Sequence, residues 1–263
     1  DVLVGGAGTD SLMIKTGAAT FTIPNTLDFG SSAAFNAIKA QGATTDVISV
    51  SLKSDARTDG ILTVDLSADT QADNGNVIDA SLVASGTLTL KGSSGADTIS
   101  PGGGVATITG GAGNDDYVVA SSAAISANNT ALFHTYSDND GTDSLVLKAG
   151  TGGYTIANTL SFGSAGDDVI DKIKAGGAIT GQISISVKDE AFEAGVETID
   201  LSADTNTDNS NIIDLSAEDE NVAYTIVGSS GKDVITTGAG ADSLTGGDGD
   251  DEYVYSTIGQ LTA

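Results

Sequence analysis

Large apolar residues recur at every ninth position in two stretches of the chain, residues 92–118 and 228–254. Each stretch consists of three consecutive nonapeptides of the form G-G-x-G-x-D-x-U-x, where U is a large apolar residue. Side chains alternate between the two faces of a strand, so each x-U-x segment predicts a three-residue strand whose middle side chain points inward. The predicted inward residues are Ile99, Ile108, Tyr117, Ile235, Leu244 and Tyr253.

The glycines of the nonapeptide predict tight turns between these strands, because glycine adopts positive φ angles without a Cβ clash. Two nonapeptides then complete one flattened coil of a parallel β-roll, with turns on alternating sides. Position-6 aspartates that are two repeats apart stack on the same side, at the strand spacing of about 4.8 Å. We therefore expect Asp97 over Asp115, and Asp233 over Asp251.

Stacked carboxylates at this spacing point to a divalent cation. Two of them repel by about 3–4 kcal/mol at an effective dielectric constant near 20, and a cation between them reverses the sign. Ca²⁺ accepts 6–8 oxygens at about 2.3–2.6 Å, so the pattern predicts several calcium ions, with backbone carbonyls completing each shell. An ion-free Gly/Asp-rich loop is the alternative, above all for the isolated copy at residues 5–13. The predicted metal ligands are Asp10, Asp97, Asp115, Asp143, Asp233, Asp242 and Asp251, with the loop glycines Gly92, Gly95, Gly110, Gly113, Gly228, Gly231, Gly246 and Gly249.

The two triplets differ at position 6 of the middle repeat, which is Ala106 in the first and Asp242 in the second. The first triplet is therefore expected to hold one ion fewer, or to hold an ion more weakly on that side.

A duplication of about 135 residues organises the whole chain. The segment GTDSLMIKTGAATFTIPNTLDFG (8–30) recurs as GTDSLVLKAGTGGYTIANTLSFG (141–163), and TVDLSADTQADNGNVIDAS (63–81) recurs as TIDLSADTNTDNSNIIDLS (198–216). We predict two tandem units, 1–134 and 135–263, each ending in one nonapeptide triplet. The predicted fold class is all-β: parallel β-roll or β-solenoid coils, with extra β-strands and one short helix in each unit.

The extra strands are expected where apolar residues alternate, at 48–52 and 183–187 and again within 60–69 and 195–204. The short helix is expected in the second unit from a capping serine followed by acidic and then apolar residues, with lysines toward its C-terminal end. Its residues are Ser164, Asp167, Asp168, Val169, Ile170, Lys172, Ile173 and Lys174; its counterpart in the first unit contains Phe35, Ile38 and Lys39.

Two further polar groups are predicted to be structural. Asp69, Asp73, Asn74, Asn76 and Asp79 have counterparts at 204, 208, 209, 211 and 214, and we favour Asx turns and stacked side chains at coil corners over a further calcium site. The Glu218–Asp219–Glu220 run is expected to form a solvated loop.

Composition excludes several functions. The chain has 36 acidic against 10 basic residues and a formal net charge of -26, so nucleic acid and anionic membrane surfaces are unsuitable partners. Cysteine is absent, which leaves no disulfide framework, and no apolar run is long enough to span a membrane. His134 is the single histidine and no nucleophile motif is present, so we predict no catalytic site and no enzyme activity.

The nonapeptide triplets resemble those of the RTX calcium-binding proteins. The order of GVETIDLS (195–202), a Ser/Gly-rich strand and RTX repeats is similar to the surface-layer (S-layer) proteins of Gram-negative bacteria, although the first copy has Leu62 in the position of Glu197. The resemblance implies a secreted, cell-surface structural protein that leaves by type I secretion and self-associates into a lattice or filament. A polysaccharide anchor would lie elsewhere in a longer parent chain. The alternatives are the stalk of a large RTX adhesin and the secretion domain of an extracellular hydrolase.

Overall fold

The computed structural model describes residues 8–15, 20–26, 35–56, 59–73, 75–121, 135–137, 140–150, 152–156, 170–188, 195–219 and 221–255. The chain divides into two compact units, one comprising Asp1–Val118 with Ala131–Asp143 and the other Val119–Thr130 with Ser144–Ala263. The tandem units 1–134 and 135–263 follow the sequence duplication and remain a prediction.

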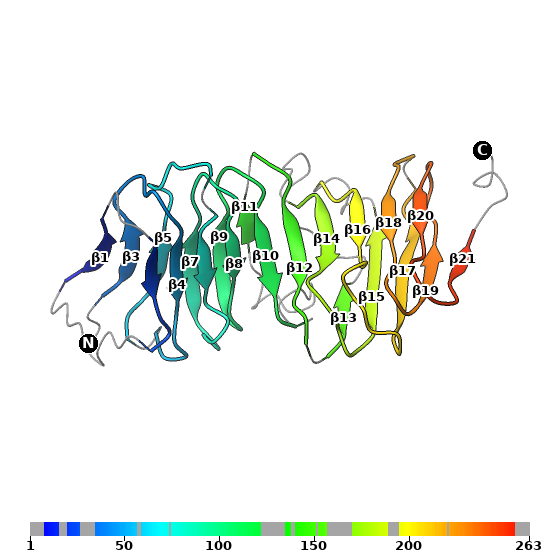
Figure 1. Ribbon diagram of the computed structural model, residues 1–263, viewed down its shortest axis with the longest axis horizontal. Coiled ribbons are helices and arrows are strands. Elements are labelled where there is room, and N and C mark those ends of the chain that lie inside the picture. Colours follow the sequence, from blue (N-terminus) through cyan, green and yellow to red (C-terminus); the bar gives the residue numbers. More distant parts are fainter. Residues whose placement is uncertain are drawn as a thin grey trace. The chain divides into compact units, whose positions relative to one another are not determined.

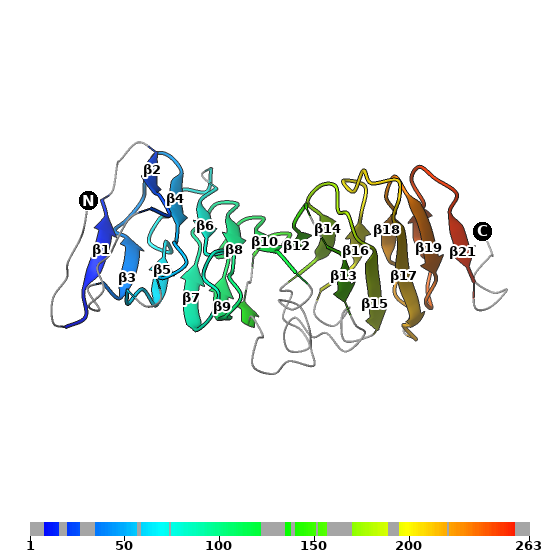
Figure 2. The same cartoon turned by 90° about the horizontal axis from the view of Figure 1, so that it is seen from below.

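The first unit consists of two parallel sheets, and successive strands alternate between them (Figures 1 and 2). One sheet has the order β1 (Ser11–Ile14), β3 (Ala37–Ala40), β5 (Thr63–Asp65), β7 (Thr87–Lys91), β9 (Val105–Thr109) and β11 (Thr135–Ser137). The other has the order β2 (Phe21–Ile23), β4 (Ile48–Ser51), β6 (Val77–Asp79), β8 (Thr98–Ser100) and β10 (Asp116–Val119). Every two strands therefore complete one coil of a β-solenoid.

The second unit repeats this plan. Its even-numbered strands are β12 (Ser144–Leu147), β14 (Lys172–Ala175), β16 (Thr198–Asp200), β18 (Thr225–Val227) and β20 (Ser243–Thr245). Its odd-numbered strands are β13 (Tyr154–Ile156), β15 (Ile183–Lys188), β17 (Ser210–Ala217), β19 (Lys232–Thr236) and β21 (Glu252–Val254). The predicted all-β solenoid with parallel strands is thus confirmed, including the extra strands β4, β5, β15 and β16 between the nonapeptide regions.

The core is a set of apolar columns, one residue deep on each strand. In the first unit Ile78 pairs in register with Ile99, and Ile99 pairs with Tyr117. All three side chains are fully buried. Parallel pairing in identical register places like residues over one another at about the 4.8 Å strand spacing. Each fully buried side chain of this size contributes about 1.5–3 kcal/mol, so the columns supply much of the driving force for coiling.

The inward column of the second triplet is less covered than the pattern predicts. Ile235 is fully buried, whereas Leu244 is half-buried and Tyr253 is 42 % exposed. Both residues keep the expected register, with Ile226 paired to Leu244 and Ile235 paired to Tyr253. They lie on β20 and β21, each of which is the edge strand of its sheet, so among the described residues no further coil covers them.

The predicted short helices are wrong wherever the structure describes them. Lys172, Ile173 and Lys174 form β14, and Ile38 and Lys39 lie in β3. No helix occurs among the described residues. The reason is that the Ile-Lys-Ala pattern also fits a period of two, and the parallel neighbours bury Ile38 and Ile173 completely. Ile170 and Phe35 lie in connections, and the predicted N-terminal residues 164–169 are outside the described part.

Candidate metal centre

A column of aspartate and asparagine side chains runs along one row of turns in the first unit. The Oδ1 atom of each accepts a hydrogen bond from a backbone N–H one coil earlier. Asn76 N donates to Asp97 at 2.6 Å, Asp97 N to Asp115 at 2.6 Å, and Asp115 N to Asp143 at 2.7 Å. Ile48 N donates to Asn76 at 2.7 Å. We call this column the Asx ladder. It places Asp97 over Asp115, as the spacing predicts, and adds Asn76 and Asp143.

The second unit contains the equivalent ladder. Ile183 N donates to Asn211 Oδ1 at 2.9 Å, and Asp233 N donates to Asp251 Oδ1 at 3.0 Å. On the opposite row of turns, Tyr224 N donates to Asp242 Oδ1 at 3.1 Å. Asp242 is therefore not part of the same column as Asp233 and Asp251. The ladder therefore recurs in both units, with Asn76 and Asn211 ahead of the nonapeptides and the aspartates within them.

The first turn of each triplet adds a serine to the ladder. Ser93 N donates to Asp97 Oδ2 at 2.5 Å, and Ser93 Oγ lies 3.0 Å from both carboxylate oxygens. In the second triplet Ser229 N donates to Asp233 Oδ2 at 2.7 Å, and Ser229 Oγ lies 3.2 and 3.0 Å from the two oxygens. All four side chains are buried. The carboxylates are thus held inside their turns by neutral donors.

Carboxylate and carbonyl oxygens converge where the glycines of position 1 have no side chain. A Cβ placed on Gly92 would lie 2.2 Å from Gly110 O, in the next coil, and 2.4 Å from Asp97 Oδ2. At Gly228 the distances are 2.0 Å to Gly246 O and 2.6 Å to Asp233 Oδ2. In each turn the two oxygens are therefore no more than 4.6 Å apart, a separation that one Ca²⁺ ion with oxygen bonds of about 2.3–2.6 Å can bridge.

Two other predicted ligands, Asp251 and Asp10, also have carboxylate oxygens directed into their turns or buried. In the last turn, a Cβ on Gly246 would lie 2.0 Å from Asp251 Oδ2. Asp10 donates its N–H to Asn36 Oδ1 at 3.1 Å, and its own Oδ2 is buried with no hydrogen-bond partner among the described residues. Gly113 and Gly249 adopt φ angles of 110° and pack on the backbone of Gly95 and Gly231 one coil earlier, so these glycines set the close approach of adjacent turns.

Side chains alone do not complete a coordination shell at these turns. Within the described part of the chain, no three acidic or histidine side chains gather at one point. A cation at the turns would therefore take most of its oxygens from the backbone, which suits calcium because it accepts carbonyl ligands and irregular geometry.

Burial makes the turn carboxylates costly to ionise. It raises the pKa of the Asp97 carboxyl to about 6, against the lowering effect of the hydrogen bonds from Ser93 and Asn76. Burial likewise raises the pKa of Asp233 and of Asp242 above 3.8. A raised carboxyl pKa means that the surroundings disfavour the charged form, and a bound cation would remove that penalty.

The second oxygen-rich cluster makes the contacts between stacked coil corners that the sequence predicts. Asp69 accepts hydrogen bonds from Thr44 N at 2.9 Å and Thr44 Oγ1 at 2.7 Å, and from Asn76 Nδ2 at 3.1 Å. Asp204 accepts the equivalent bond from Ile179 N at 2.9 Å. These contacts link stacked coil corners. Asn74 lies outside the described residues.

The expectation of a solvated loop at 218–220 is wrong for Glu218, which is only 3 % exposed. Its Oε2 accepts a hydrogen bond from the Tyr224 hydroxyl at 3.3 Å. Sequence reasoning missed this residue because it was judged by its acidic neighbours. The available signal was the aligned position in the first copy, Val83, which is apolar and also buried. Asp219 is exposed, and residue 220 lies outside the described part.

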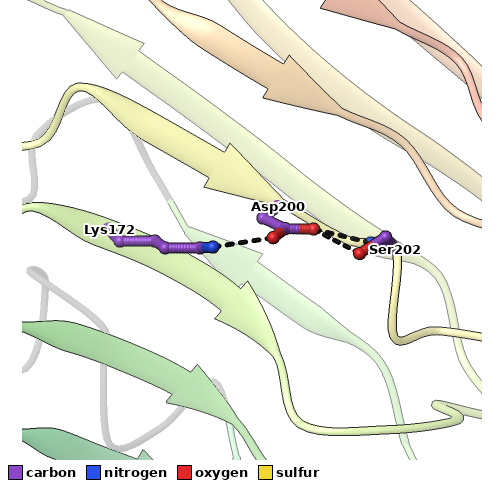
Figure 3. A network of polar contacts seen from close by, with 3 residues as sticks. All are labelled: Lys172, Asp200 and Ser202. Atoms are coloured by element: carbon purple, nitrogen blue, oxygen red, sulfur yellow. Dashed lines mark hydrogen bonds and ion pairs between the residues drawn. The ribbon is translucent and has the colours of Figure 1, made fainter.

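An ion pair on the outer face distinguishes the second unit from the first (Figure 3). Lys172 Nζ lies 2.7 Å from Asp200 Oδ2, and Ser202 donates to Asp200 Oδ1 through its hydroxyl at 2.6 Å. Burial raises the pKa of Asp200, but the hydrogen bonds from Lys172 and Ser202 and the charge of Lys172 outweigh it and leave the pKa below 3.8. In the first unit Ser67 donates to Asp65 in the same way, while Ala37 stands where Lys172 would be.

Comparison with known families agrees with this geometry. A family model described as RTX calcium-binding nonapeptide repeat (4 copies) matches residues 89–117 and 225–253, the regions that carry the two triplets. The chain carries RTX calcium-binding nonapeptide repeats. No curated protein and no solved structure matches the chain.

The RTX match covers the segments in which carboxylate and carbonyl oxygens converge, and this supports calcium as the ligand. Such solenoids are typical of structural or binding segments of secreted proteins. No helix in the described part is both long and apolar enough to cross a membrane. His134, which we expect to have no catalytic role, lies outside the described residues.

Proposed function

We propose that the chain is a calcium-dependent structural segment of a secreted cell-surface protein, in which calcium at the RTX turns drives folding and assembly. The observation that carries this proposal is the convergence of a buried aspartate oxygen with a carbonyl oxygen of the next coil, at Gly92 and again at Gly228. Bound calcium supplies the positive charge that offsets the ionisation penalty of these buried carboxylates.

The protein's own residues act in three ways in this proposal. Asp97, Asp115, Asp143, Asp233 and Asp251 provide the carboxylates of the ladders, with Asp242 on the opposite turns and Asp10 near the start. The glycines bring successive turns close enough to share ligands. The apolar columns hold the strands in register once the turns close. Extracellular calcium modules bind at about 10⁻⁴–10⁻³ M, so the calcium-dependent turns would stay open inside a cell and close outside it.

The decisive test is calcium titration of the chain, followed by circular dichroism and isothermal calorimetry. We expect a large gain in β signal on adding calcium and its loss in EGTA. Asp251→Asn should raise the calcium concentration at the midpoint by about tenfold, because ligand charge sets affinity at such sites. Asp250→Asn is the matched control, since Asp250 is exposed and adjacent. A β signal that is identical in calcium and EGTA would refute the proposal.

Within this function we favour a subunit of an S-layer or a comparable array, with calcium also joining neighbouring copies. The basis is the order of GVET strand and RTX repeats, together with the acidic surface of a chain with net charge -26. Electron microscopy of calcium-loaded protein distinguishes the candidates. A two-dimensional lattice is expected for an array.

The stalk of an RTX adhesin is the second candidate, because a tandem duplication also suits a long extender. For it we expect single extended particles and no lattice. The secretion domain of an extracellular hydrolase ranks third. It would require a catalytic domain elsewhere in the parent chain.

A further inference from the structure

The four ladder turns of the RTX triplets differ at position 2 of the nonapeptide. The first turn of each triplet has serine there, Ser93 or Ser229, and the third has glycine, Gly111 or Gly247. Position 2 of one coil packs on position 2 of the next: a Cβ on Gly111 would lie 1.8 Å from Ser93 O, and one on Gly247 would lie 2.0 Å from Ser229 O. Serine followed by glycine is therefore a stacked pair that recurs in both units.

The serine hydroxyl is fixed as well as buried. Gly95 N donates to Ser93 Oγ at 3.3 Å, and Gly231 N donates to Ser229 Oγ at 3.2 Å. Because these N–H groups occupy the acceptor side of the hydroxyl, its single proton is directed to the aspartate. Ser93 and Ser229 are 4 % and 3 % exposed, and Asp97 and Asp233 are 1 % and 0 % exposed. Water competes poorly for these bonds.

The glycine turns lack this donor. Asp251 receives the N–H of Asp233, but Gly247 offers no side chain where Ser229 stands one coil earlier. A carboxylate in a serine turn is thus held by backbone and hydroxyl donors together, whereas one in a glycine turn has no hydroxyl from position 2. Hydrogen bonds to a charged group are stronger than neutral ones, so the difference is energetically significant.

We propose that Ser93 and Ser229 are positioning residues that hold Asp97 and Asp233 in ligand geometry before any cation binds. The first turn of each triplet then forms without calcium, and the glycine turns close only when calcium arrives. This inference rests on the proposed function, because it concerns the same turns.

The test compares Ser93→Ala/Ser229→Ala with Ser94→Ala/Ser230→Ala in the full chain. Ser94 and Ser230 occupy position 3 of the same turns and use their backbone N–H, which donates to Asp69 O and Asp204 O. Hydrogen exchange in EGTA should show protected amides at Ser93 and Ser229 in the wild type and the control, and exposed ones in the test variant. The calcium midpoint should rise roughly tenfold for each hydroxyl removed, the factor expected for a charge-assisted hydrogen bond.

The readout that separates positioning from plain structural support is the dependence on calcium. The test variant should lose more stability at saturating calcium than in EGTA, because a tenfold weaker affinity removes about 1.4 kcal/mol of calcium-dependent stabilisation at each site. An equal loss in both conditions would overturn the proposal, as would wild-type protection in the test variant.

If the alanine variant does not fold at any calcium concentration, the variant Ser93→Gly/Ser229→Gly tests the positioning role instead. These substitutions restore the glycine of the RTX pattern, so first turns that are protected in calcium but exposed in EGTA support the proposal. First turns that stay protected in EGTA, or no folding in either condition, overturn it. Absence of calcium binding to the wild type by calorimetry would instead refute the proposed function, and protection in EGTA would still be measurable.

Discussion

In the first RTX triplet Ala106 pairs in register with Leu88, whereas in the second Asp242 accepts a hydrogen bond from the backbone of Tyr224. Polar residues therefore replace apolar ones at these positions, with Tyr224 in place of Leu88. A third position follows the same change, with Glu218 in place of Val83. Val83, Leu88 and Ala106 are all buried, so the first unit closes this row of turns with apolar packing. The second closes it with a hydroxyl–carboxylate contact and a further potential ligand. Two copies of one fold can therefore differ in how far their turns depend on ions.

The triplets also differ in how well their last strand is covered, and this gives the largest expected effect. Tyr117 is fully buried and Tyr253 is 42 % exposed, although both occupy the same position of the repeat. Tyr117→Ala should cost about 3–5 kcal/mol of unfolding free energy, because it leaves a cavity in a packed column. Tyr253→Ala should cost about 1–2 kcal/mol. Urea unfolding in calcium measures both, and equal losses would contradict the difference in coverage.

The hydroxyl–carboxylate contact of the second unit should contribute an intermediate amount to the free energy of unfolding. Tyr224→Phe removes the hydroxyl that donates to the buried Glu218 and should cost about 1–3 kcal/mol in EGTA. The triple change Glu218→Val, Tyr224→Leu and Asp242→Ala installs the apolar set of the first unit. It should recover that loss in EGTA, because a well-packed apolar group can replace a buried polar network at little cost. A triple variant less stable than Tyr224→Phe would show that the closures are not interchangeable.

The outer-face ion pair of the second unit should have the smallest effect. Lys172→Met should cost about 1 kcal/mol or less, since the pair is partly exposed. Because the folded-state pKa of Asp200 is lowered, the contribution is present above pH 3.8 and is lost as the pH falls through that lowered value. Lys232→Met is the control: its Nζ lies 3.6 Å from Glu252 and both side chains are about half exposed. Thermal unfolding at pH 7 and pH 2.5 measures the difference.

The repeat pattern was enough to predict the solenoid and the stacking of its aspartates. A nine-residue period fixes both the strand direction and the side of each turn, so Asp97 and Asp115 had to meet. The same logic failed for Ile38 and Ile173, because a four-residue segment that ends in Ile-Lys-Ala fits a helix end and a strand equally well. Only the neighbouring strands, which bury these isoleucines, decide between the two.

The local sequence also does not show which single polar residues are buried. Glu218 looks solvated among acidic neighbours, and its place under Tyr224 follows from the coil position that it shares with Val83. The donors to Asp97 could not be predicted either, because the role of Ser93 depends on the path of the turn rather than on the repeat spacing. The metal ligands remain a prediction of the repeat pattern.

The direction of the ladder bonds has a consequence for growth. The Oδ1 atom of each ladder side chain accepts an amide N–H of the preceding coil, so the ladder bonds all run in one direction and each coil is completed by the one that follows it. A gene that gains one more repeat at the C-terminal end adds one coil, and its Asx side chain bonds the previous coil without disturbing the existing ladder bonds. Because the ladder bonds run in one direction, the chain can lengthen by duplication of repeats while the hydrogen bonds between existing coils stay intact.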